Sequence, residues 1–205
     1  MDTWQDPAKV EEYGGRVGRI PARIAGEAEL LDTLPHVVRR ILDLGCGDGR
    51  LTALVMEAHP ELEVAVGLDN SPPMLRAASA RFGGDHRVTL VPHDLDAPLP
   101  PFEAFDAVIS GFAIHHVTHE RKRSRFGEIF AALVPGGVFA NLEVVLCATP
   151  ALQTEFFAQI GRADGDPEDV CAPVEPQLEW MRAAGFSDVD CQWRWRGFAL
   201  LVGRR

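Results

Sequence analysis

The sequence predicts an α/β fold in which parallel strands alternate with helices and a β-hairpin closes the chain. Short apolar runs alternate with helix-periodic segments across residues 41–145. The first run, residues 41–44, leads directly into glycines at every second position and then into a helical pattern. Two apolar runs, 189–195 and 198–203, are separated only by Arg196 and Gly197, which is typical of a hairpin. At 205 residues the chain suits one domain.

Composition excludes several classes of protein. The net charge of -10 argues against broad binding to nucleic acid or to an anionic membrane. No run approaches the ~20 apolar residues of a membrane span. The acidic start has no apolar signal region, and the four cysteines form no C-x-x-C pair. We therefore expect a cytoplasmic protein with reduced thiols and no membrane association. A nucleic-acid partner is disfavoured but not excluded, because the net charge leaves room for a local basic patch.

The glycine loop that follows residues 41–44 predicts a tight turn from a buried strand into a helix that begins near Gly49. Gly45 and Gly47 can adopt positive φ, and without a Cβ they let a ligand approach the backbone. The helix N-terminus would offer free N–H groups to that ligand. A turn that binds nothing is the alternative. The pattern G-x-G-x-G differs from the dinucleotide pattern G-x-G-x-x-G.

The first twenty residues are polar and rich in glycine. They fit either a mobile tail or a lid that brings Tyr13, Arg16 or Arg19 to a ligand carboxylate, and we favour the lid. Pro21 then marks a helix start. The helix is expected to bury a stripe formed by Ile24, Ala25, Ala28, Leu31 and Leu34.

Acidic residues follow the second and third predicted strands, 63–69 and 87–92. Asp69 could accept both hydroxyls of a ribose, or it could cap the next helix; Ser71 followed by Pro72 is a better cap, which favours the ribose role. Asp94 could accept an adenine amine while Leu95 packs on the ring, or it could simply make a turn. Because strand ends meet at one carboxyl edge, the ligand role is favoured for both acids.

Two histidines follow the fourth predicted strand, 105–110. His115 or His116 could be a general base, or either could cap or pack beneath the next helix. Together with His119 and Glu120 they match no H-E-x-x-H pattern, so no metal site is expected. The helix over 118–133 should turn its basic run, residues 120–123, toward solvent.

Polar residues also punctuate the fifth predicted strand, 138–145. Asn141 and Glu143 share one face of it, and Glu143 could contact substrate or be a satisfied buried acid. A helix over 150–160, a loop over 161–169 and a helix over 175–184 follow. Phe156 and Phe157 could line a substrate pocket, or they could serve packing alone.

Five segments in order resemble the class I S-adenosylmethionine-dependent methyltransferases: residues 42–49 (LDLGCGDG), 67–75 (GLDNSPPML), 93–95 (HDL), 105–110 (FDAVIS) and 133–137 (LVPGG). The resemblance implies a Rossmann-like, doubly wound sheet of seven strands, mostly parallel with an antiparallel last strand. It also implies S-adenosyl-L-methionine as cofactor. The implied contact residues are Asp43, Gly45, Cys46, Gly47, Asp69, Asn70, Met74, His93, Asp94, Leu95, Ser110, Gly111 and Phe112.

On this resemblance we expect methyl transfer to a small-molecule acceptor, with His116, His115 or Glu143 taking a proton where the acceptor carries one. The alternatives are a tRNA-modifying enzyme of the wobble-uridine type, a catalytically silent cofactor-binding domain and, more distantly, a nicotinamide dehydrogenase. A second copy of the chain, forming a homodimer, is a partner to test. We expect one domain divided into an N-terminal lid and helix region (1–36), a cofactor-binding core (37–145), an inserted substrate-side region (146–186) and the hairpin (187–205).

Overall fold

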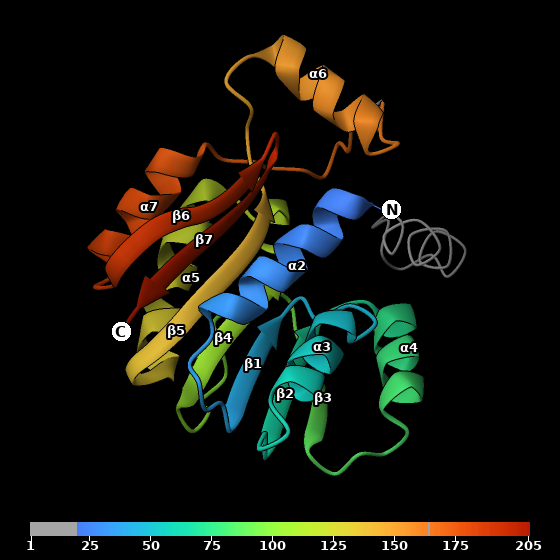
Figure 1. Cartoon of the computed structure of the whole chain (residues 1–205), viewed down its shortest axis with the longest axis vertical. Helices are drawn as coiled ribbons and strands as arrows, with labels where there is room; N and C mark the ends of the chain where they lie inside the picture. Colours follow the sequence, from blue (N-terminus) through green and yellow to red (C-terminus); the bar gives the residue numbers. More distant parts are fainter. Residues whose placement is uncertain (1–19, 164) are drawn as a thin grey trace.

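A computed structural model describes residues 20–163 and 165–205 (Figure 1). The lid residues considered above, Tyr13, Arg16 and Arg19, lie outside this part of the chain. The elements in order are α2 (Pro21–Thr33), β1 (Arg40–Leu44), α3 (Arg50–Ala58), β2 (Val64–Asp69), α4 (Pro72–Phe82), β3 (Val88–Pro92), β4 (Phe105–Gly111), the 3₁₀ turn η2 (Ile114–His116), α5 (His119–Ala132), β5 (Leu133–Val144), α6 (Pro150–Gln159), α7 (Val174–Ala183), β6 (Ser187–Trp195) and β7 (Phe198–Arg204).

The strands form one seven-stranded sheet in the order β3-β2-β1-β4-β5-β7-β6. The first five strands in that order run parallel, and β7 pairs antiparallel with both β5 and β6. The predicted α/β architecture, including the terminal hairpin, is therefore confirmed. The order reverses at β1 and β4, and the carboxyl ends of these strands flank the crevice in which open α/β sheets bind ligands.

Side chains of β1 alternate between the two faces of the sheet. Ile41 packs with residues of α2 and α3 on one face, and Leu42 and Leu44 pack with residues of α5 and α7 on the other. This alternation is the two-residue period of a β-strand. Every β1 side chain after Arg40 is buried, which shows that helices cover both faces of the sheet at this strand. In Figure 1, α2 and α3 accordingly lie in front of the sheet, and α5 and α7 lie behind it.

Helix α2 begins at Pro21 as predicted, but only the end of the expected buried stripe is confirmed: Leu34 is buried and Leu31 is partly buried, whereas Ala25 and Ala28 are exposed. Ile24 is 47% exposed, and the helix instead buries Gly26, Glu27, Leu30 and Thr33. A Cβ at position 26 would come within 2.7 Å of Leu142, so glycine lets the helix approach the sheet closely. Apolar periodicity missed this face because two of its members are glycine and glutamate.

The run at the start of α5, residues 120–123, is only in part the solvated face that was expected: Glu120 and Arg123 are exposed, but Lys122 is not. Lys122 and Arg125 are almost fully buried. The Lys122 ammonium donates hydrogen bonds to the backbone carbonyls of Val117 and Val170, the latter at 2.8 Å. The Arg125 guanidinium donates to the Ala97 carbonyl at 2.7 Å. Because both cations are buried and bound to backbone carbonyls, they do not contribute to the basic surface that a tRNA-modifying enzyme would need.

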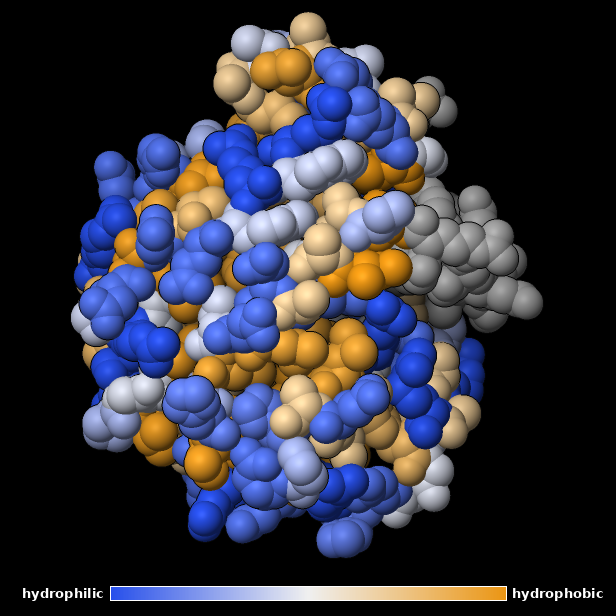
Figure 2. All heavy atoms as spheres, in the orientation of Figure 1, coloured by the Kyte–Doolittle hydropathy of each residue, from blue (hydrophilic) through white to orange (hydrophobic). Residues whose placement is uncertain are grey.

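Aromatic residues of α6 pack on the hairpin. The Phe156 ring lies 5.0 Å from the Phe198 ring, and Phe156 is fully buried. Of the two readings offered for Phe156, packing is therefore the one observed. Helix α6 stands beyond the carboxyl end of β5 in Figure 1, and Figure 2 shows hydrophobic atoms there. Leu152 of this helix is 44% exposed. Among the described helices, none combines the length and apolar character needed to cross a membrane.

Candidate active site

The glycine loop after β1 is pressed against the segment that follows β4. Gly45, Gly47 and Gly49 have φ values of 69°, 55° and 78°, in the region that favours glycine. A Cβ at Gly45 would come within 2.1 Å of the Ala113 Cβ. The loop therefore needs glycine at position 45 for two independent reasons, its backbone conformation and this close approach.

The Asp69 carboxylate ties the end of β2 to this loop. Its Oδ2 accepts a hydrogen bond from the Gly47 N–H at 2.8 Å, and its Oδ1 accepts one from the Ser71 N–H at 2.8 Å. The Ser71 hydroxyl accepts from the Met74 N–H, which confirms Ser71 as the N-cap of α4. We expected that capping by Ser71 would leave the Asp69 carboxylate entirely for a ligand. This expectation is corrected, because both Asp69 oxygens accept hydrogen bonds from backbone N–H groups. Each carboxylate oxygen can accept a second hydrogen bond.

Asp43 is a buried acid beneath the loop. Its Oδ2 accepts a hydrogen bond from the Thr52 hydroxyl at 2.7 Å, whereas its Oδ1 has no hydrogen-bond partner within residues 20–163 and 165–205. Burial raises the pKa of Asp43 to about 7, although the Thr52 hydrogen bond opposes the shift; the nearby Asp69 charge adds to it. A buried acceptor oxygen without a partner is suited to a ligand that donates a hydrogen bond or carries positive charge.

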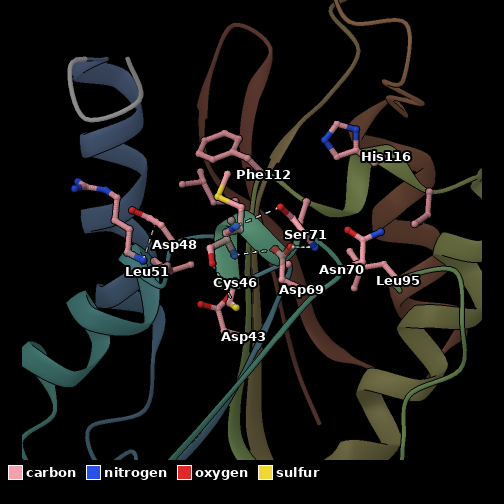
Figure 3. A pocket seen from close by; sticks show the side chains of 18 of the residues that line it. Asp43, Cys46, Asp48, Leu51, Asp69, Asn70, Ser71, Leu95, Phe112 and His116 are labelled. Carbon is pink, nitrogen blue, oxygen red and sulfur yellow. Dashed lines mark hydrogen bonds between the residues drawn. The ribbon is translucent and has the colours of Figure 1, made fainter. Parts of the chain in front are cut away.

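These groups line a cavity of about 320 Å³ at the carboxyl edge of the sheet (Figure 3). Two of the predicted cofactor-contact residues, Ser110 and His93, do not line this cavity. The Ser110 hydroxyl donates to the Leu44 carbonyl inside the sheet, and His93 is held by its backbone N–H on the Asp69 carbonyl. The predicted site residues that line the cavity are Asp43, Gly45, Cys46, Gly47, Asp69, Asn70, Met74, Asp94, Leu95, Gly111, Phe112 and His116.

A charged group from α2 and α3 forms one end of the cavity. Glu27 is 3% exposed and accepts hydrogen bonds from Arg23 at 2.9 Å and from Arg50 at 2.7 Å. The Arg23 guanidinium also lies 4.6 Å from the centre of the Phe112 ring. Our reading of the sequence missed all three charged residues. The i, i+4 spacing of Arg23 and Glu27 was the available signal, but the approach of Arg50 is tertiary.

Figure 3 shows His116 at the end of the cavity away from Asp48. His115, its neighbour in the chain, has different surroundings. His115 is 2% exposed, and its Nδ1 lies 2.6 Å from a Glu143 carboxylate oxygen while its Nε2 lies 3.4 Å from the Asp169 Oδ1. Burial opposes protonation of His115, but the Glu143 and Asp169 carboxylates outweigh it and raise its pKa to about 9. His115 and Glu143 therefore form a buried pair that does not line the cavity.

His116 lines the cavity, with its Nδ1 3.6 Å from the same Asp169 oxygen. Burial and the neighbouring His115 charge lower the pKa of His116 to about 4, so its imidazole is neutral at neutral pH. Asp169 was read from the sequence only as the end of a Gly/Asp-rich loop. It reaches the histidines because the loop docks on η2, with the Val170 N–H donating to the His115 carbonyl at 2.8 Å.

The sequence is similar to those of known methyltransferases. A family described as "Methyltransferase domain" matches residues 41–137. A demethylmenaquinone methyltransferase from Roseiflexus castenholzii is 32% identical over 172 residues, which cover 76% of this chain and 71% of the relative. The chain belongs to the class I S-adenosylmethionine-dependent methyltransferases. An uncharacterized methyltransferase from Mycobacterium tuberculosis is 37% identical over 125 residues, and the match spans 59% of that relative and 60% of this chain.

The fold of this methyltransferase is also similar to the folds of solved structures. PigF with SAH superimposes with a TM-score of 0.73 at 21% identity, covering 99% of this chain and 61% of PigF. An O-methyltransferase family 2 protein from Planctomyces limnophilus, in complex with apigenin, gives a TM-score of 0.73 at 19% identity and covers 100% and 62% of the two chains. At these identities the likeness concerns the fold.

Proposed function

We propose that this methyltransferase binds S-adenosylmethionine in the 320 Å³ cavity and transfers its methyl group to a small-molecule acceptor beside His116. The observation that carries the proposal concerns Asp43, which lines the cavity and whose buried Oδ1 has no hydrogen-bond partner in the described chain. The ammonium group of a methionine moiety is a donor of matching charge. Backbone of Gly45 and Gly47 would lie along that moiety, since neither residue has a side chain to exclude it.

The rest of the cavity supports a nucleoside at its other end. Asp69 lines the cavity, and its carboxylate is an acceptor of the kind that suits the two ribose hydroxyls. Met74 and Leu95 offer apolar surface for an adenine ring, and Asp94 offers an acceptor for its amine. Asn70, Cys46, Gly111 and Phe112 complete the proposed contacts. His93 and Ser110, which do not line the cavity, are omitted from them.

His116 is the member of the predicted catalytic group that lines the cavity, so we propose that it contacts the acceptor. S-adenosylmethionine supplies an already activated methyl group, and the protein mainly positions the two reactants and excludes water. A neutral imidazole can accept a proton where the acceptor carries one. His115 and Glu143 are then positioning residues, because their contacts are with each other and with the loop behind His116.

Calorimetry with S-adenosylmethionine and S-adenosylhomocysteine, with NAD as the control ligand, tests the cofactor. Binding of both adenosyl ligands without NAD supports the proposal, and absence of adenosyl binding overturns it. Turnover is measured as S-adenosylhomocysteine release with candidate acceptors. Demethylmenaquinone and trans-aconitate are the first to try, because relatives of 32% and 35% identity carry the names of enzymes for them.

Two other functions are outcomes of the same experiments. A silent domain would bind the adenosyl ligands and release no product with any acceptor. A tRNA-modifying enzyme would turn over only with tRNA. The burial of Lys122 and Arg125 disfavours the second outcome, since it removes two cations from the surface that would meet a phosphate backbone.

A further inference from the structure

Three potential metal-ligand atoms lie close together around His116, which lines the cavity. They are the His115 Nε2, the His116 Nδ1 and the Asp169 Oδ1, and all lie within 4.8 Å of one another. The carboxylate oxygen is 3.4 Å from the first nitrogen and 3.6 Å from the second. Ligands bonded at ~2.0–2.2 Å to a tetrahedral ion stand about 3.4 Å apart, so the spacing around this oxygen is that of a metal site.

We propose that His115, His116 and Asp169 bind a divalent transition-metal ion, with Zn²⁺ as the prototype. Imidazole nitrogens with one carboxylate suit Zn²⁺, Fe²⁺ and similar ions better than Mg²⁺ or Ca²⁺. Three protein ligands leave at least one coordination position open, which is typical of a catalytic rather than a structural ion. Since His116 lines the cavity, that position would face the acceptor.

The groups behind the three ligands fit such a site. His115 turns its other ring nitrogen to Glu143 at 2.6 Å, the arrangement by which a carboxylate fixes the orientation and tautomer of a metal-bound histidine. The second oxygen of Asp169 lies 3.7 Å from the Arg162 guanidinium, which leaves Oδ1 as the oxygen that faces the histidines. Backbone contacts also hold the loop: the Val170 carbonyl accepts from Lys122 at 2.8 Å.

The ion would define the acceptor class, a use that rests on the proposed function. A bound ion attracts an oxygen of the acceptor, such as a hydroxyl, enol or carboxylate, and lowers the pKa of that group. His116 would then serve as a ligand rather than as the proton acceptor. Sequence spacing predicted no metal site because Asp169 lies more than fifty residues from the histidines and only the folded loop brings it near.

Cobalt binding tests the site without an acceptor. The full chain is stripped with a chelating resin and titrated with Co²⁺ while visible d–d absorption is recorded, and Zn²⁺ is then added as competitor. We expect one equivalent per chain, displaced by Zn²⁺. We expect at least about tenfold weaker binding in Asp169→Ala. We expect about 10–100-fold weaker binding in Glu143→Gln, because Glu143 contacts the liganding His115 and is not itself one of the three ligands. His86→Ala, an exposed histidine outside the cluster, is the matched control and should bind like wild type.

Two outcomes overturn the inference: no saturable binding near one equivalent, or equal affinity in Asp169→Ala and His86→Ala. Far-ultraviolet circular dichroism and urea denaturation show that each variant is folded, whether or not it binds S-adenosylhomocysteine. Asp69→Ala keeps its Co²⁺ spectrum if the metal site stands apart from the cofactor site, so failure of the cofactor proposal and failure of the metal site give different results.

Discussion

The Asp69 carboxylate accepts a hydrogen bond from the Gly47 N–H at 2.8 Å, which joins the end of β2 to the loop after β1. The other Asp69 oxygen holds the Ser71 N–H at the start of α4. One side chain therefore fixes the loop and the next helix before any ligand arrives, and the same side chain lines the cavity. Cofactor binding and local stability should respond together when it is removed.

Asp69→Ala is expected to weaken S-adenosylhomocysteine binding and to lower the free energy of unfolding by ~1–3 kcal/mol, because two backbone donors lose their acceptor. Calorimetry and urea denaturation measure the two effects. Asp32→Ala, an exposed acid on α2, is the control and should change neither. A variant that binds the ligand like wild type would contradict a role for Asp69 in the cofactor site.

Cofactor affinity should fall as the pH drops below about 7. Burial raises the pKa of Asp43 to about 7, so the free protein protonates this group in that range, whereas a ligand ammonium requires the carboxylate form. Affinity should therefore decrease by up to about tenfold per pH unit below the pKa, as calorimetry between about pH 7 and about pH 5.5 would record. In Asp43→Asn the binding should be weak and this pH dependence lost. Equal slopes in both proteins would assign the titration to another group.

Gly45→Ala and Gly84→Ala separate backbone strain from close approach. Both glycines have positive φ, 69° and 84°, but a Cβ at Gly84 meets nothing within 4 Å, whereas one at Gly45 meets Ala113 at 2.1 Å. Gly84→Ala should lose ~1–2 kcal/mol of stability from conformation alone. Gly45→Ala should lose about 1–3 kcal/mol more from overlap and should bind S-adenosylhomocysteine poorly. Equal losses of stability would mean that the loop can move away from Ala113 at no cost.

Lys122→Met should loosen the loop that carries Asp169. The ammonium is buried against the carbonyls of Val117 and Val170, and its removal leaves both without their donor. We expect a loss of ~1–3 kcal/mol in unfolding free energy and faster limited proteolysis within residues 161–172. Arg123→Met removes the same charge one residue away, from an exposed side chain that stacks on Trp180, and should cost at most about 1 kcal/mol. Proteolysis at the wild-type rate in Lys122→Met would show that the backbone contact of Val170 suffices.

Local patterns were enough to predict most of the elements. The apolar run of β1, the Ser71 cap of α4 and the glycine that ends that helix are determined by neighbours in the chain. The same holds for the glycine loop, because positive φ at Gly45 and Gly47 is a local requirement that few other residues meet. Part of the cofactor site could be predicted for this reason, since Asp43, Asp69 and Asp94 each lie within about two residues of a strand end at the shared edge.

Tertiary structure decided where charge is buried. Charged side chains are normally exposed, yet three of them are buried here because distant segments supply a partner for each. Lys122 donates to the Val170 carbonyl and Arg125 to the Ala97 carbonyl, and Glu27 accepts from Arg50. The acceptor end depends on the same effect, because Asp169 reaches His115 and His116 only when the 161–172 loop docks on η2. Local sequence sets conformational preference, whereas the stability of a buried charge depends on partners that only the fold supplies.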